Sequence, residues 1–125
     1  MTQINEIYIC ELCGNIVEVV TQGGGKLNCC NKEMTLKVEN TVDAAKEKHI
    51  PVLTINGDNA VVQVGSIVHP MEDSHFITWI EIQQGDKFQR VQLKPNIEPK
   101  AVFRIDPNLP VAAREYCNKH GLWKS

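Results

Sequence analysis

Four of the five cysteines in this chain lie within its first thirty residues, and their spacing limits what that stretch can fold into. Two of them form a Cys10-x-x-Cys13 motif, and the other two are the adjacent residues Cys29 and Cys30. A Cys-x-x-Cys turn lets two thiolates bind one metal ion, and Gly14 can adopt the positive φ angle of such a turn. With the second pair on a returning hairpin, the pattern predicts a tetrahedral sulfur site for iron or zinc.

The metal would also hold this part of the chain folded. A module of roughly 35 residues is too small to build an adequate hydrophobic core. A structural zinc knuckle is the plain alternative, although adjacent cysteines force a more distorted arrangement than repeated Cys-x-x-Cys motifs do. Disulfides are the weaker interpretation, because clustered cysteines in a reducing cytosol are more often metal ligands or catalytic groups.

Composition excludes several other classes of protein. With 42% hydrophobic and 22% charged residues in 125, the chain has the composition of an ordinary globular protein rather than a disordered one. A formal net charge of −2 gives no reason to expect a nucleic acid or a membrane surface as partner. Residues 1–10 contain no basic region followed by an apolar run, and no apolar stretch is long enough to span a bilayer. We therefore expect no signal peptide and a cytoplasmic location.

Beyond a boundary expected near residue 38, the pattern turns to short strands at regular spacing. Turn signals such as Asn56-Gly57-Asp58 separate the apolar runs at intervals of roughly 8–12 residues. This predicts a mainly β chain, in which a small metal-stapled domain, 1–38, precedes an immunoglobulin-like antiparallel β-sandwich, 39–125. The expected strands of the sandwich are 52–55, 60–64, 76–83, 87–93, 101–105 and 111–116. We interpret 41–48 as a loop with one helical turn, since Pro51 stops anything longer.

All four histidines lie in the second part of the chain, in loops or at predicted strand edges, and the fifth cysteine follows the last predicted strand. Loops at one end of a sandwich converge in space, so side chains from separate connections can meet there. Four imidazoles and one thiolate suit a square-pyramidal iron with an open sixth position, whereas zinc prefers four ligands. Scattered surface histidines with their own hydrogen bonds are the alternative. The five residues are His49, His69, His75, Cys117 and His120.

These motifs resemble those of a known family. The first four cysteines resemble those of the desulforedoxin module in their arrangement as Cys10-x-x-Cys13 and Cys29-Cys30. A similarity to the iron site of superoxide reductases is carried by Glu47-Lys48-His49-Ile50-Pro51, His69-Pro70-Met71, His75 and Cys117-Asn118-Lys119-His120-Gly121. Taken together, the motifs are similar to the two-iron desulfoferrodoxins over nearly the full length of the chain. Asn31 and Leu122 depart from the pattern of some relatives, at positions that are not ligands.

The resemblance implies a superoxide reductase that converts superoxide to hydrogen peroxide by one-electron reduction, without dismutation, in defence against oxidative stress. A rubredoxin-like iron would be held by Cys10, Cys13, Cys29 and Cys30. The catalytic iron would be bound in a plane by His49, His69, His75 and His120, with Cys117 as the axial ligand. Superoxide would bind at the open face opposite the sulfur. A homodimer and a rubredoxin-type or other reductase as electron donor are implied as well.

The resemblance also implies roles for the two residues before His49. Lys48 would attract superoxide and stabilise the negative charge that develops on it. Glu47 is an anionic oxygen ligand that could close the sixth position of the oxidised iron. The axial thiolate would push electron density through the metal, as in cysteine-ligated haem.

Two other functions stay open on the residues alone. One is a non-enzymatic, rubredoxin-like electron carrier with structural histidines, which would not consume superoxide rapidly when reduced. The other is a zinc-stabilised binding module, which would be colourless.

Overall fold

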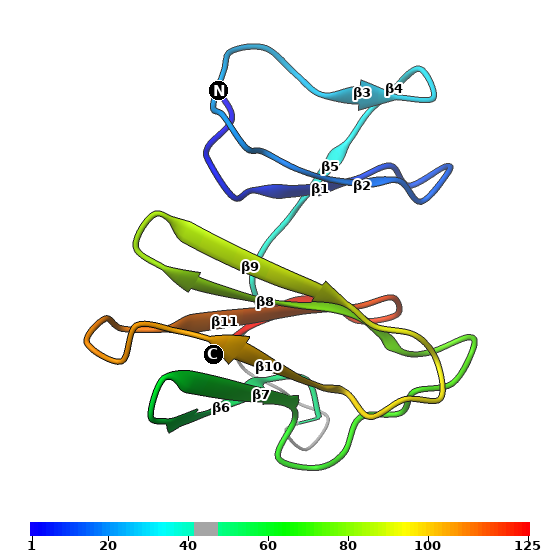
Figure 1. Ribbon diagram of the computed structural model, residues 1–125. Coiled ribbons are helices and arrows are strands. Elements are labelled where there is room, and N and C mark those ends of the chain that lie inside the picture. The colour runs from blue at the N-terminus through cyan, green and yellow to red at the C-terminus, as the bar shows by residue number, and fades with distance from the viewer. Residues whose placement is uncertain (42–47) are drawn as a thin grey trace. The chain divides into compact units, whose positions relative to one another are not determined.

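The computed structural model describes residues 1–41 and 48–125, and every regular element in these ranges is a β-strand. The chain divides into two compact units, Met1–Val38 and Glu39–Ser125 (Figure 1). The mainly β fold expected from the sequence is confirmed. Within the described ranges, no helix has the length and apolarity to cross a membrane. The helical turn expected within 41–48 falls mainly on 42–47, which lie outside the described residues.

The first unit contains five short strands and very little core. The central strand β1 (Ile7–Ile9) pairs antiparallel with β2 (Ile16–Glu18) and β5 (Thr35–Lys37), while β3 (Asn28–Cys29) and β4 (Lys32–Glu33) form a separate hairpin. The buried hydrophobic side chains of the unit are Ile7, Cys10, Val19 and Met34. So small a core agrees with the expectation that this unit needs a metal to stay folded.

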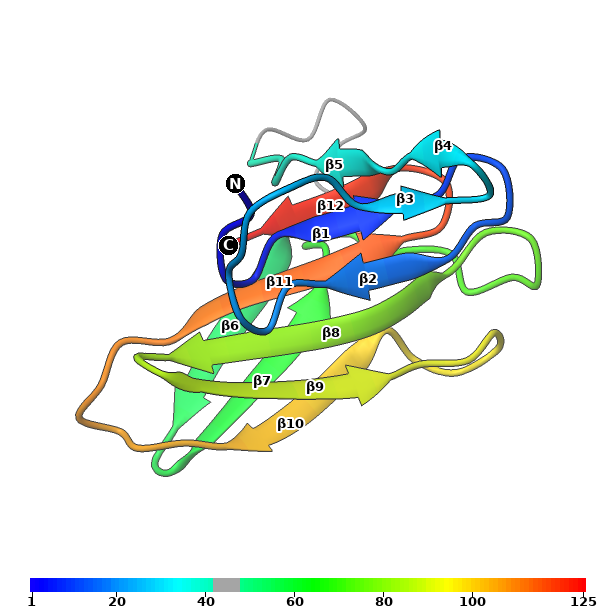
Figure 2. The ribbon, with the colours of Figure 1, turned by 90° about the horizontal axis from the view of Figure 1, so that it is seen from above.

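The second unit is a sandwich of two antiparallel sheets. One sheet has three strands, with β7 (Asn59–Val64) between β6 (Pro51–Asn56) and β10 (Lys100–Arg104). The other has four strands in the order β12 (Gly121–Lys124), β11 (Ala112–Cys117), β8 (Ile77–Gln84), β9 (Lys87–Gln92). In Figure 2, which looks onto the sandwich from above, β6, β7 and β10 pass behind β8, β9 and β11. Six of these strands correspond to the six that the sequence predicts.

Alternate residues of the strands fill the space between the sheets. Val62 and Val64 of β7, Phe103 of β10 and Ile82 of β8 are all buried in one continuous apolar cluster. Such alternation is the period-2 pattern of strands with one buried face. Cys117, the last residue of β11, is completely buried in the same cluster, so the core itself positions one of the predicted metal ligands.

The strand β12 is absent from the sequence prediction. Gly121, with φ of +85°, reverses the chain so that it pairs opposite Cys117. On its other edge, β12 is bridged by Asn40, whose N–H donates to the carbonyl of Leu122. Leu122 and Trp123 form an apolar run of two residues, which is too short for alternation to indicate a strand.

The pairing of β8 with β11 changes register beside the predicted site. Tyr116 lies opposite Trp79, but Cys117 lies opposite Ile77, which leaves Thr78 as an extra residue on β8. The hydroxyl of Thr78 donates to the carbonyl of Tyr116 at 3.2 Å. Bulges of this kind re-aim side chains near functional sites. Ile77 consequently reaches the core, whereas Trp79 stacks on Tyr116 away from it.

Candidate metal centres

The four cysteines of the first unit come together from two turns. Their sulfur atoms all lie within 4.8 Å of one another. Cys10 and Cys13 lie between β1 and β2, where Gly14 has a φ of +82° and its N–H donates to the carbonyl of Cys10 at 2.9 Å. The positive φ angle expected at Gly14 is thus confirmed.

The adjacent cysteines converge because of the turn that carries them. Cys30 and Asn31 have φ angles of +55° and +59° and form the two-residue connection between β3 and β4. Positive φ at both central residues is the signature of a type I′ hairpin turn. The turn brings the Cys29 sulfur to 3.9 Å from that of Cys30 and 3.5 Å from that of Cys13. Asparagine at position 31 suits this left-handed conformation better than most side chains do.

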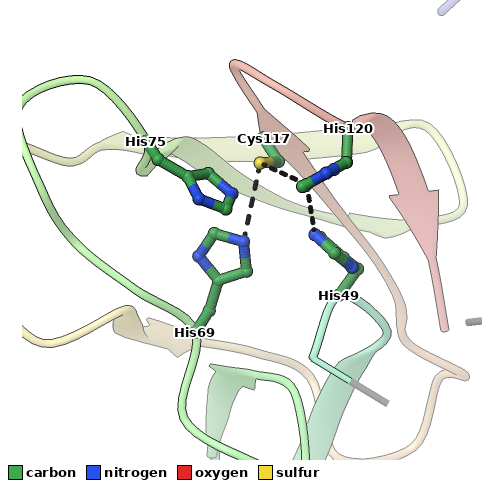
Figure 3. A group of neighbouring side chains, drawn as sticks. All are labelled: His49, His69, His75, Cys117 and His120. Atoms are coloured by element: carbon green, nitrogen blue, oxygen red, sulfur yellow. Dashed lines mark hydrogen bonds between the residues drawn. The ribbon is translucent and has the colours of Figure 1, made fainter. Parts of the chain in front are cut away.

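The second group assembles from three connections at one end of the sandwich. His49 lies just before β6, His69 and His75 lie between β7 and β8, and Cys117 and His120 flank the turn from β11 to β12. The ligand atoms of all five side chains lie within 4.8 Å of one another. Figure 3 shows the four imidazole rings gathered around a common space beside the Cys117 sulfur.

The four rings form a closed circuit with nearly equal sides. Ring centroids are 4.8 Å apart for His49 and His69, 4.8 Å for His69 and His75, 4.9 Å for His75 and His120, and 4.7 Å for His120 and His49. Each pair meets edge to face. The Cys117 sulfur lies 3.5 Å from Nε2 of His69 and 3.8 Å from Nδ1 of His120. The group is thus a closed circuit of four imidazoles with a single sulfur beside it.

Known proteins resemble both halves of the chain. The family model described as desulfoferrodoxin matches residues 41–125, and that of the desulfoferrodoxin N-terminal domain matches residues 2–36. The desulfoferrodoxin of Syntrophotalea carbinolica is 54% identical over 125 residues, which cover 100% of this chain and 98% of that protein.

The chain belongs to the desulfoferrodoxin family.

Proteins named superoxide reductases are also similar to this chain. A superoxide reductase of Pyrococcus horikoshii is 36% identical over 97 residues, covering 63% of this chain and 84% of that protein. The crystal structure of the superoxide reductase from Treponema pallidum superposes with a TM-score of 0.81 at 27% identity and 96% coverage of each chain. The cysteine group and the histidine–cysteine group match the two iron sites of a desulfoferrodoxin.

The sulfur group has the chemistry of a metal site. Backbone N–H donation from Cys13 lowers the pKa of the Cys10 thiol to about 6, whereas hydrogen bonding with the Cys13 and Cys29 sulfurs raises that of Cys30 to about 12. One thiolate therefore opposes the ionisation of the next. A bound cation removes this conflict, because it deprotonates the thiols that coordinate it.

Two of the imidazoles, those of His69 and His75, are held toward the neutral form that binds metals. His69 Nδ1 lies 2.6 Å from the carbonyl oxygen of Pro70. A carbonyl only accepts, so Nδ1 carries the hydrogen and Nε2 presents a lone pair toward the group. Burial lowers the pKa of His69 to about 4, and it also lowers that of His75. Nε2 of His75 is buried and finds no hydrogen-bond partner among the described residues, as expected of an atom meant for a metal.

Cys117 is buried beneath these rings. Burial raises the pKa of its thiol, and the backbone N–H groups of Lys119 and His120 oppose that rise. A bound cation would therefore be needed to hold it as a thiolate. His49 and His69 are also buried, while His75 is half-buried and His120 is exposed. Among the described residues, the members of the group that solvent reaches are His75 and His120.

The two residues expected beside the iron differ in what the structure describes. Lys48 is half-buried in the bend directly before His49. Glu47 lies within 42–47, outside the described residues, so its predicted role stays a prediction.

Trp123 is a site neighbour that the sequence analysis missed. Its ring stacks on His49 with centroids 4.7 Å apart and 16° between the planes. Its indole N–H donates to the carbonyl of His120 at 3.1 Å. One side chain therefore supports two members of the group. The available signal was its position three residues after His120, next to a glycine turn.

Proposed function

We propose that this desulfoferrodoxin is a superoxide reductase whose catalytic iron is bound by His49, His69, His75, Cys117 and His120. Superoxide takes up one electron and two protons and leaves as hydrogen peroxide. The observation that carries the proposal is the closed circuit of four imidazoles beside one buried sulfur. The similarity to named superoxide reductases supports it.

Ferrous iron bound there would supply the electron. The chain contributes the electrostatics of the site. Four neutral imidazoles and one thiolate leave a divalent cation with one uncompensated positive charge, which favours an anionic substrate. Five protein ligands would leave a sixth position of a bound iron open for that substrate.

Cys117 and Lys48 would play different roles at the bound iron. The thiolate of Cys117 would donate electron density to the metal. Lys48, next to His49, would attract superoxide and stabilise its developing charge. Glu47 would close the open position once the iron is oxidised.

The first unit, 1–38, would hold a rubredoxin-like iron through Cys10, Cys13, Cys29 and Cys30. Cys13 and Cys30 are exposed, which would bring this iron close to solvent and to a redox partner. A rubredoxin-type or other reductase would supply the electrons. We further propose a homodimer in a reducing cytoplasm, where the cysteines stay free as they are here.

The electron carrier and the zinc module are less well supported. Neither explains why all four histidines converge on the one buried cysteine of the second unit. A purely structural histidine would be expected to form hydrogen bonds, whereas the buried Nε2 of His75 has no partner among the described residues.

Metal analysis and a kinetic measurement test the proposal. Purified protein should contain two irons per chain and absorb visible light. The reduced protein, mixed with a pulse of superoxide, should consume it rapidly and yield one peroxide per iron oxidised. A colourless zinc protein would contradict the proposal, and so would an iron protein that leaves superoxide to its spontaneous decay.

A further inference from the structure

The side chain of Asn118 bridges two of the connections that form the histidine–cysteine group. Its Oδ1 accepts the N–H of Phe76 at 3.0 Å, and its Nδ2 donates to the carbonyl of Ser74 at 3.1 Å. Its own backbone N–H donates to the carbonyl of Phe76 at 3.2 Å. Asn118 directly follows Cys117, and its two side-chain partners are the residues on either side of His75. One side-chain amide therefore holds the main chain on both sides of His75.

The backbone of His75 is held on its other side by a tight turn. Its N–H donates to the carbonyl of Glu72 at 3.1 Å, and its carbonyl accepts the N–H of Glu72 at 2.9 Å. The turn fixes the local shape of the loop but does not tie it to β11. Asn118 makes that tie through its side-chain amide and its backbone N–H, next to the residue that bears the sulfur.

His75 depends on its backbone more than the other three histidines do. The ring of His69 is fixed by the Pro70 carbonyl, and that of His49 is stacked on Trp123 and lies 3.0 Å from a ring nitrogen of His120. Nε2 of His75 has no hydrogen-bond partner among the described residues. The place of its Nε2 relative to the Cys117 sulfur is therefore set mainly by where its main chain is held.

We propose that Asn118 is a positioning residue that sets the place of His75 relative to Cys117. The inference rests on the proposed function in one respect, namely that this group binds iron. Partners that orient ligands from outside the coordination sphere typically change metal affinity by about 10–100-fold when removed. Asn118 acts on main-chain atoms, so its loss should loosen one equatorial ligand and leave the sulfur in place.

Two substitutions and a matched control separate positioning from general stability. Asn118→Ala removes both side-chain hydrogen bonds. Asn118→Asp keeps an acceptor for the Phe76 N–H but places a carboxylate oxygen against the Ser74 carbonyl. Asn108→Ala is the control, because Asn108 lies in the loop at the other end of β11 and its contact there is made by its backbone N–H.

Iron binding at the histidine–cysteine group can be compared with that at the four-cysteine site of the same chain. Asn118→Ala should bind iron at the histidine–cysteine group roughly tenfold more weakly and shift its thiolate-to-iron absorption after oxidation. Asn118→Asp should fall between Ala and wild type. The absorption of the four-cysteine iron and both signals of Asn108→Ala should not change.

A second readout needs no metal in the second unit. In protein reconstituted at the cysteine group only, the Phe76 amide of Asn118→Ala should exchange with solvent about fivefold faster, the effect of losing about 1 kcal/mol of hydrogen bonding. Asn118→Asp should restore the protection.

The outcomes distinguish the two proposals. Wild-type affinity and absorption in Asn118→Ala, with faster Phe76 exchange, would overturn positioning, because the hydrogen bonds would then be shown to break without effect on the site. Unchanged exchange would overturn it as well. If Asn118→Ala does not fold, Asn118→Asp with wild-type affinity and absorption would overturn it. A wild-type protein that binds no iron at the histidine–cysteine group would instead overturn the proposed function.

Discussion

Cys117 is the residue at which the hydrophobic core and the proposed iron site meet. It is wholly buried among apolar side chains, and its sulfur faces His69 and His120. Burial opposes ionisation of its thiol. Such a position keeps water away from the sulfur.

Substituting Cys117 tests its role as the axial ligand. Cys117→Ser preserves the size of the side chain, so the sandwich should stay folded. The thiolate-to-iron absorption of the histidine site should disappear, and superoxide reduction should fall to background. Visible spectra and pulsed-superoxide kinetics measure both, with the four-cysteine absorption as the reference. An unchanged spectrum would remove Cys117 from the site.

Lys48 is the nearest cationic residue in sequence to His49, and its proposed role is electrostatic. Lys48→Ala should slow the reaction with superoxide by roughly tenfold at low salt, because local charge raises the encounter rate of an anion by 10–10³-fold. Iron content should not change. The difference should shrink as salt rises, since screening shortens the reach of the charge.

The control is Lys87→Ala on the exposed strand β9. Equal rates for Lys48→Ala and wild type at low salt would contradict the role of Lys48.

At the scale of elements, the segment before β6 and the connection after β7 approach each other closely at a glycine. Gly65 follows β7 with a φ of +78°, and its N–H donates to the carbonyl of Ile50 at 3.1 Å. A Cβ at this position would lie 2.5 Å from the carbonyl oxygens of both Lys48 and Ile67. The segment that bears Lys48 and His49 can take its place only if residue 65 has no side chain.

Gly65→Ala should therefore lower the free energy of unfolding by more than the strain of a left-handed backbone alone would. Gly57→Ala is the matched control, because Gly57 has a φ of +62° but nothing within 4 Å of the added Cβ. Left-handed strain should destabilise the control by about 1 kcal/mol. Gly65→Ala should lose at least about 2–3 kcal/mol, because the clash with backbone atoms adds to the strain.

Urea unfolding and iron content measure the two glycine variants. The Gly65 variant should also bind less iron at the histidine site. Equal losses of stability in the two variants would show that the close approach to Lys48 does not matter.

At the scale of the whole molecule, the two units depend on metal to different degrees. The first buries four hydrophobic residues, whereas the second has a continuous core between two sheets. A unit with so little core gains its folding free energy from its metal. The second should keep its fold without one.

Cys29→Ser tests this difference. The variant should contain one iron per chain instead of two, and amides in 1–38 should lose protection from hydrogen exchange. Amides of β7, β8 and β11 should keep theirs, and the reduced variant should still consume superoxide. Retained protection throughout 1–38 would show that the first unit folds without its metal.

Local patterns in the sequence determine much of this protein. Alternation predicts β6 to β11, because a strand with one buried face needs an apolar residue at every second position. Short spacing predicts the four-cysteine group, because a tight turn alone brings Cys10 near Cys13. The five residues singled out from the strand-flanking loops do lie together.

Tertiary structure alone decides the rest. The bulge at Thr78, the bridge from Asn40 to β12 and the stacking of Trp123 on His49 each join segments far apart in the chain. The amide of Asn118 does the same across 42 residues to Phe76. Sequence patterns record which face of a segment is buried, but not which distant atom it meets. The residue types of the site are therefore evident from the sequence, while the circuit that the histidines form and the contacts that hold it arise only when the sheets pack.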